Sequence, residues 1–173
     1  MKLITAALRV AQILFGAVVL ALSVSLIKGQ HLGSAPAVQT YGAFTGAFSL
    51  VMGDVALVAV FVQAIPMVAV LLADALAATF YLVGGIVIVV KLRGISCSGN
   101  DRLNLAKMFF NPLLNGGCVG KGKNLNCWYY LPDRSDKLHS RCKMNEADAA
   151  FMFISFVFIL GAAVFTFLNS RRR

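Results

Sequence analysis

Four long apolar runs dominate this sequence and leave few folds open to it. They cover residues 4–27, 38–62, 66–90 and 147–168. Each can cross roughly 30 Å of hydrocarbon, which takes about 20 helical residues, whereas a membrane barrel needs short segments of alternating hydrophobicity. A hydrophobic fraction of 59% with only 13% charged residues also departs from the usual balance of soluble proteins. We therefore expect an all-α membrane protein, with residues 1–173 forming one four-helix bundle.

The stretches between the runs are unequal. Residues 28–37 form a short Gly/Ser/Pro link, and residues 63–65 form a tight turn before Pro66, which suits the first turn of a helix. The segment 91–146 is long enough for a small extramembranous subdomain, and residues 169–173 form a tail. The first run is longer than the apolar core of a signal peptide, so we expect it to be a retained span.

Two signals disagree about orientation. An even number of spans places both termini on one side of the membrane. Most Lys and Arg residues lie in the segment 91–146, so a positive-inside count would place that segment in the cytosol. All four cysteines lie there too, as is typical of disulfides on the oxidising side, and long loops are translocated largely regardless of charge. We follow the cysteines and expect cytosolic termini and an extracellular loop.

The four cysteines allow three disulfide pairings. We favour the nested pairing, Cys97–Cys142 outside and Cys118–Cys127 inside. The outer bridge would join the end of the third span to the start of the fourth, and the inner bridge would close a Gly-rich hairpin. A zinc site that includes His139 is the alternative, but structural zinc usually takes paired ligands two to four residues apart. We expect no metal.

Two short stretches of the loop are too apolar to lie free in water. One is residues 103–114, in which we expect Met108 and the two following phenylalanines to point inward, and the other follows Cys127. Amphipathic rings favour the membrane interface, so these stretches could face lipid or a partner, or form the core of a cystine-tied lid. The candidate interface residues are Phe109, Phe110, Trp128, Tyr129 and Tyr130. The net charge of +9 suits anionic lipid, and no recognition motif for nucleic acid accompanies it.

Three ionisable residues interrupt the spans at a similar depth. Arg9, Asp54 and Asp74 each lie about 10 Å in from the cytoplasmic boundary, and Gln12 lies close to that layer. A lone charge there costs roughly 2.5–3.5 kcal/mol on insertion scales, so such residues normally face the bundle and pair. We expect Arg9 to pair with Asp54, with Asp74 or with both, as a structural lock.

Small residues recur at helical spacing on two of the spans. Helices approach closely at such stripes, either within one bundle or between copies of a homo-oligomer, and we favour packing within the bundle. The stripe residues are Gly42, Gly46 and Gly53 on the second span and Ala78 and Gly85 on the third.

Catalytic chemistry has little support in the sequence. It contains no nucleophile elbow, no zinc-protease motif and no P-loop, so we expect neither an enzyme nor a cofactor other than bound lipid or sterol. A small proton- or ion-coupled transporter or channel that uses Asp54 and Asp74 is the functional alternative. Against it, the four spans show no inverted repeat and no helix broken in its middle.

The order of these features resembles the MARVEL-domain proteins of fungi, and within them the non-classical export protein family. The resemblance is carried by "LRVAQILF", "QAIP", "LLADALAATFYLVGGIVIVVKLRGISC" and "RCKMNEADAAF", and position by position by Arg9, Asp74, Cys97 and Cys142. It implies a plasma-membrane organiser of eisosome-type, sterol- and sphingolipid-rich microdomains, linked to vesicle traffic or unconventional secretion. Its implied partners are membrane lipids, further copies of itself, and other eisosome or vesicle membrane proteins. The extra pair Cys118 and Cys127 departs from the family pattern.

Overall fold

The computed structural model describes residues 2–62, 65–120, 125–130 and 135–171. The elements, in chain order, are α1 (Lys2–Lys28), α2 (Ala37–Phe61), α3 (Met67–Leu92), α4 (Arg102–Phe110), β1 (Cys118–Val119), β2 (Asn126–Cys127), the short 3-10 helix η2 (Trp128–Tyr130) and α5 (Ser135–Arg171). The turn predicted at Gln63 and Ala64 lies outside the described residues.

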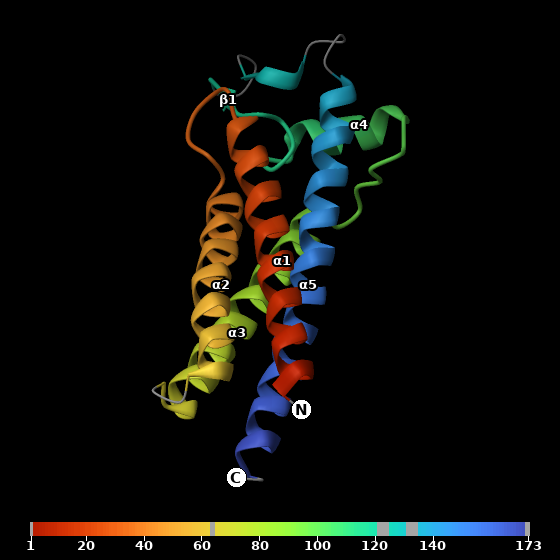
Figure 1. Ribbon diagram of the computed structural model, residues 1–173. Helices are drawn as coiled ribbons and strands as arrows, with labels where there is room; N and C mark the ends of the chain where they lie inside the picture. The colour runs from red at the N-terminus through yellow and green to blue at the C-terminus, as the bar shows by residue number, and fades with distance from the viewer. Residues whose placement is uncertain (1, 63–64, 121–124, 131–134, 172–173) are drawn as a thin grey trace.

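Four long helices form the body of the molecule, as Figure 1 shows. The helices α1, α2, α3 and α5 are each long and apolar enough to cross a membrane, which confirms the predicted all-α, four-span class. The helix α1 packs against α2 and α5, and α3 packs against α5. Both chain termini lie at one end of the bundle, while α4 and the two short strands lie at the other end. We call these the terminal end and the loop end.

The helix boundaries differ from the predicted ones chiefly in α5. It begins at Ser135, well before the predicted residue 147, and it continues to Arg171 through most of the predicted tail. The charged residues before position 147 lower the hydropathy but suit a helix, and Asp136 in the first turn favours a helix start. Pro66 is the N-cap of α3, with a ψ of 132°, so it precedes the helix instead of forming its first turn.

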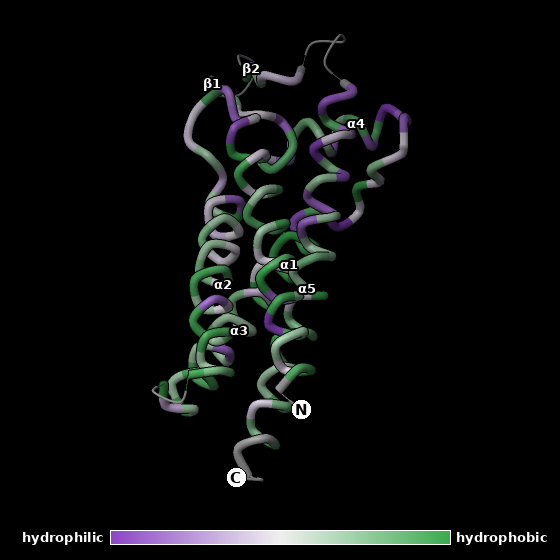
Figure 2. Tube along the Cα trace, in the orientation of Figure 1, coloured by the Kyte–Doolittle hydropathy of each residue, from purple (hydrophilic) through white to green (hydrophobic). Residues whose placement is uncertain are grey.

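Apolar and small side chains fill the interior of the bundle. Its core contains Val19, Tyr81, Ile88, Met152 and Ile159, all at most 1% exposed. The outward faces of the same helices carry exposed Val, Leu, Ile and Phe, which suits a surface surrounded by lipid. Figure 2 shows this contrast along the molecule, with hydrophobic residues over most of the bundle and hydrophilic ones concentrated at the loop end.

A second, smaller core lies at the loop end. It is formed by Met108, Leu113, Leu114, Tyr129, Leu138 and Cys142. The strands β1 and β2 pair antiparallel beside it, with Cys118 opposite Cys127. The link between α1 and α2 is tied to this subdomain, because the backbone N–H of His31 donates to the Gly116 carbonyl oxygen at 2.9 Å. The loop end is therefore a packed lid on the bundle.

Candidate functional site

An ion pair inside the bundle joins α1 to α3 near the terminal end. The Arg9 guanidinium donates from Nη1 to Asp74 Oδ1 at 2.5 Å and from Nη2 to Asp74 Oδ2 at 2.6 Å. Both side chains are at most 3% exposed. This two-pronged geometry is the strongest arrangement available to an arginine and a carboxylate. The predicted pairing of Arg9 with Asp74 is present in the structure.

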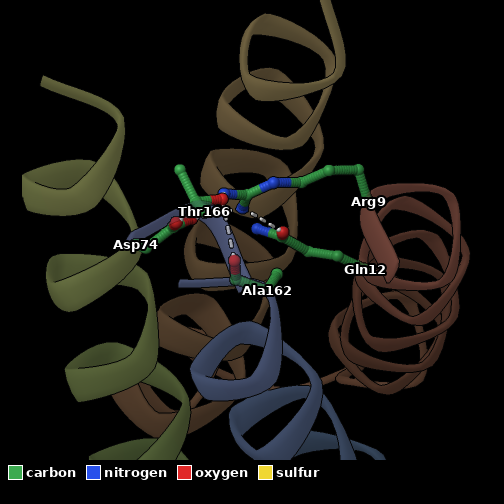
Figure 3. Close-up of polar contacts among 5 residues, drawn as sticks. All are labelled: Arg9, Gln12, Asp74, Ala162 and Thr166. Atoms are coloured by element: carbon green, nitrogen blue, oxygen red, sulfur yellow. Dashed lines mark hydrogen bonds and ion pairs between the residues drawn. The ribbon is translucent and has the colours of Figure 1, made fainter. Parts of the chain in front are cut away.

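Two further helix positions complete this polar layer, as Figure 3 shows. Gln12 accepts a hydrogen bond from Arg9 Nη1 at 2.8 Å. Thr166 on α5 accepts a longer one from Arg9 Nη2 at 3.4 Å and donates to the Ala162 carbonyl oxygen at 2.8 Å. The side chain of Arg9 therefore reaches from α1 to both α3 and α5.

The predicted place of Asp54 in this layer is wrong. Asp54 is exposed on α2, and among the described residues its side chain forms no ion pair or hydrogen bond. The buried face of α2 passes through Gly53, and the next residue of a helix lies about 100° further round. Asp54 therefore faces outward.

The predicted small-residue stripes pack within the bundle. Gly42, Gly46 and Gly53 are buried on α2, as are Ala78 and Gly85 on α3. A Cβ at Gly46 would lie 2.7 Å from the backbone nitrogen of Leu20 and 2.9 Å from the carbonyl oxygen of Gly16, so α1 and α2 touch backbone to backbone there. The same stripes are not available as a seam between copies.

A second buried carboxylate lies towards the loop end and was missed by the sequence reasoning. Asp148 on α5 is 1% exposed, and its Oδ2 accepts a hydrogen bond from Ser23 Oγ on α1 at 2.9 Å. Its Oδ1 has no hydrogen-bond partner among the described residues. The signal in the sequence is spacing, because Asp148 stands three or four residues from its neighbours on one face of a helix. The structure shows that this whole face of α5 is buried: Arg141, Asn145, Asp148, Met152, Ser155, Ile159 and Ala162.

Arg141 joins the lid to the bundle. Its guanidinium donates to the carbonyl oxygens of Leu26 at 3.0 Å and Leu113 at 3.2 Å. Its Cζ lies 5.7 Å from the centre of the Tyr129 ring. Tyr129 in turn donates from its hydroxyl to the carbonyl oxygen of Gly29 at 3.1 Å. These contacts fix the lid against the end of α1.

Both predicted disulfides are present, Cys97–Cys142 and Cys118–Cys127. The outer bridge joins the segment after α3 to an outer turn of α5. His139, the additional ligand of the zinc alternative, lies on α5 and is partly buried, with Nδ1 at 3.0 Å from the Cys97 carbonyl oxygen. Within the described parts of the chain, no group of three or more His, Cys, Asp or Glu is placed to hold a metal ion.

The predicted interface aromatics divide between lid core and surface. Tyr129 is only 8% exposed and belongs to the lid core, so of the two alternatives the lid is correct for this residue and the lipid-facing surface is wrong. Trp128 packs on the lid core and stacks on His31, with ring centres 4.6 Å apart. Phe110 was expected to point inward but is 69% exposed, while Met108 is buried and Phe109 is half-buried. The side chain of Tyr130 lies outside the described part.

Comparison with protein families gives one match that covers nearly the whole chain. The model of the MARVEL family, described as a membrane-associating domain, matches residues 2–165. A comparison with curated proteins finds no match, and a comparison with solved structures finds none either. The matched region includes α1, α2 and α3, α5 as far as residue 165, both disulfides and the Arg9–Asp74 pair. This multi-pass membrane protein therefore belongs to the MARVEL membrane-associating domain family.

Proposed function

We propose that this protein organises plasma-membrane microdomains of the eisosome type by lateral self-assembly and by binding sphingolipid, sterol and anionic lipid. It acts without catalysis, its termini face the cytosol, and its lid faces outward. The family match supports the coarser part of this, a membrane-associated function of the microdomain type. The assignment to eisosomes, vesicle traffic and unconventional secretion follows the resemblance in sequence.

The proposal rests on one observation. The Arg9–Asp74 pair and the small-residue stripes are already used in contacts within the bundle, so the surface that remains for binding other molecules is the outer, apolar one. Arg9 and Asp74 neutralise each other inside the bundle, and the small-residue stripes are consumed by its own packing. On the outside, α2 and α3 present exposed apolar side chains, including Phe44, Val51 and Ile86. A protein built in this way acts through what surrounds it in the membrane.

The alternative, a proton or ion relay through Asp54 and Asp74, loses its geometric basis. Asp54 faces outward on α2, whereas Asp74 is buried and held by two hydrogen bonds from Arg9. A relay needs neighbouring groups that exchange protons, whereas Asp54 is exposed on the outer surface and Asp74 is buried inside the bundle. We therefore do not propose transport.

The test is reconstitution of the labelled full chain in giant vesicles that separate into ordered and disordered phases and contain no anionic lipid. We expect enrichment in the ordered, sterol- and sphingolipid-rich phase, and spots that bleach in several steps. A single-span peptide with the same label serves as the reference. Single copies spread evenly over both phases would overturn the proposal.

A further inference from the structure

A groove at the loop end runs between the end of α3 and the helix α4. It encloses about 530 Å³ and is lined by basic residues together with apolar ones. Two hydrogen bonds hold its walls together. Asn111 donates from Nδ2 to the Lys91 carbonyl oxygen at 2.7 Å, and Lys107 donates from Nζ to the Gly94 carbonyl oxygen at 3.2 Å. The groove is therefore part of the folded lid.

Three cationic side chains line this groove, and no carboxylate does. They are Lys91, Arg93 and Lys107, all of them exposed. A second hollow, which Arg93 also borders, is lined by Glu146, but among the described residues these two form no ion pair. Three exposed cations around one hollow, with no carboxylate in its lining, make it a region of positive potential that attracts anions.

The groove also lies at the end of a candidate membrane span. That span, α3, ends at Leu92, directly between Lys91 and Arg93. Two apolar side chains of α4, Leu103 at 67% exposed and Phe110 at 69% exposed, line the same hollow. Exposed apolar groups beside lysine and arginine at a membrane boundary are typical of an interfacial helix whose apolar face enters the acyl region.

We propose that this groove binds the anionic headgroup of a membrane lipid, with Lys91, Arg93 and Lys107 around the phosphate and Leu103 and Phe110 against the start of the acyl chains. The charge selects an anionic lipid over a zwitterionic one, and the apolar wall selects a lipid over a soluble phosphate. This inference rests on the lipid-binding part of the proposed function and gives it a location.

The test compares two charge-matched triple variants of the full chain. The groove variant is Lys91→Gln, Arg93→Gln and Lys107→Gln. The control is Arg102→Gln, Lys137→Gln and Lys143→Gln, which removes the same charge from exposed loop-end positions that do not line the groove. Each protein is extracted gently from phosphatidylcholine vesicles that contain a minority of phosphatidylglycerol, and its retained lipid is measured by native mass spectrometry.

We expect the groove variant to bind phosphatidylglycerol about a hundredfold more weakly than the unaltered chain, because it loses three basic residues that contribute about 1 kcal/mol each. The control should stay within about twofold, because its three residues do not line the groove. Equal losses of retained phosphatidylglycerol in both variants would show that only the overall positive charge of the loop end attracts the lipid, and would overturn the proposed site. Displacement of the retained lipid by added inorganic phosphate would also overturn it. The giant-vesicle test of the proposed function uses no anionic lipid, so its outcome is independent of this one.

Discussion

Arg141 on α5 donates a hydrogen bond to the Leu26 carbonyl oxygen on α1, across 3.0 Å. That oxygen is one of the last four carbonyls of α1, which have no partner within their own helix. The guanidinium satisfies it and at the same time bonds the lid at Leu113. A single side chain thus ends one helix and docks the subdomain above it.

Replacing Arg141 by methionine should lower the free energy of unfolding by at least about 2 kcal/mol, because hydrogen bonds from a charged donor are the costly ones to lose. Denaturant titration in mixed micelles measures this. Arg102→Met is the matched control, since Arg102 is exposed on α4. Equal stability of the two variants would show that Arg141 does not hold the lid.

The Arg9–Asp74 pair should behave as a unit. Arg9→Leu or Asp74→Leu alone should cost about 3–5 kcal/mol, since each strands a buried charge, and the double variant should cost less than either. Asp54→Leu, which removes a carboxylate from the outward face of α2, should leave stability nearly unchanged. Unfolding in mixed micelles provides the comparison, and additive losses in the double variant would contradict the pairing.

The contact between α1 and α2 should not tolerate a side chain at position 46. Gly46→Ala places a Cβ 2.9 Å from the Gly16 carbonyl oxygen, so the helices must separate, at a cost of about 1–3 kcal/mol. Gly161→Ala on α5 is the control, because nothing lies within 4 Å of its Cβ, and alanine should stabilise that helix by up to about 1 kcal/mol. Thermal unfolding monitored by tryptophan fluorescence should show a lower unfolding temperature for Gly46→Ala and an unchanged or higher one for Gly161→Ala.

The two disulfides should differ in what they contribute. In the chain-entropy account, the bridge Cys97–Cys142, with a sequence separation of 45, stabilises by about 4 kcal/mol, and Cys118–Cys127, with a separation of 9, by about 2.5 kcal/mol. Paired Cys→Ser variants measure each loss. Thiol labelling of the native protein should find no reactive cysteine before reduction, and four reactive thiols at that stage would disprove both bridges.

The spans could be predicted because they depend on local sequence, and a run of about 20 apolar residues has few alternatives in a membrane. The disulfide pairing followed from the spans, because Cys97 and Cys142 stand at the end of the third and near the start of the fourth. The start of α5 could not be found from hydropathy, because its first turns are charged and lie outside the hydrocarbon.

The orientation of single residues was harder to predict, for a physical reason. A helix that is apolar all round has no polar face to mark its outside, so Asp54 was assigned inward by depth alone. The buried stripe through Gly53 already implied otherwise, since adjacent residues differ by about 100° around a helix. Asp148 was overlooked because it stands among alanines, although its spacing from Asn145 and Met152 places all three on one buried face.

The length of α5 has a mechanical consequence. Its 37 residues extend for about 55 Å without a break, from the lid to beyond the membrane span. Arg141 near one end of this rod bonds α1 at its last turn, and Thr166 near the other end bonds Arg9 in the same helix. The lid and the polar layer around Arg9 are therefore mechanically joined by one continuous helix.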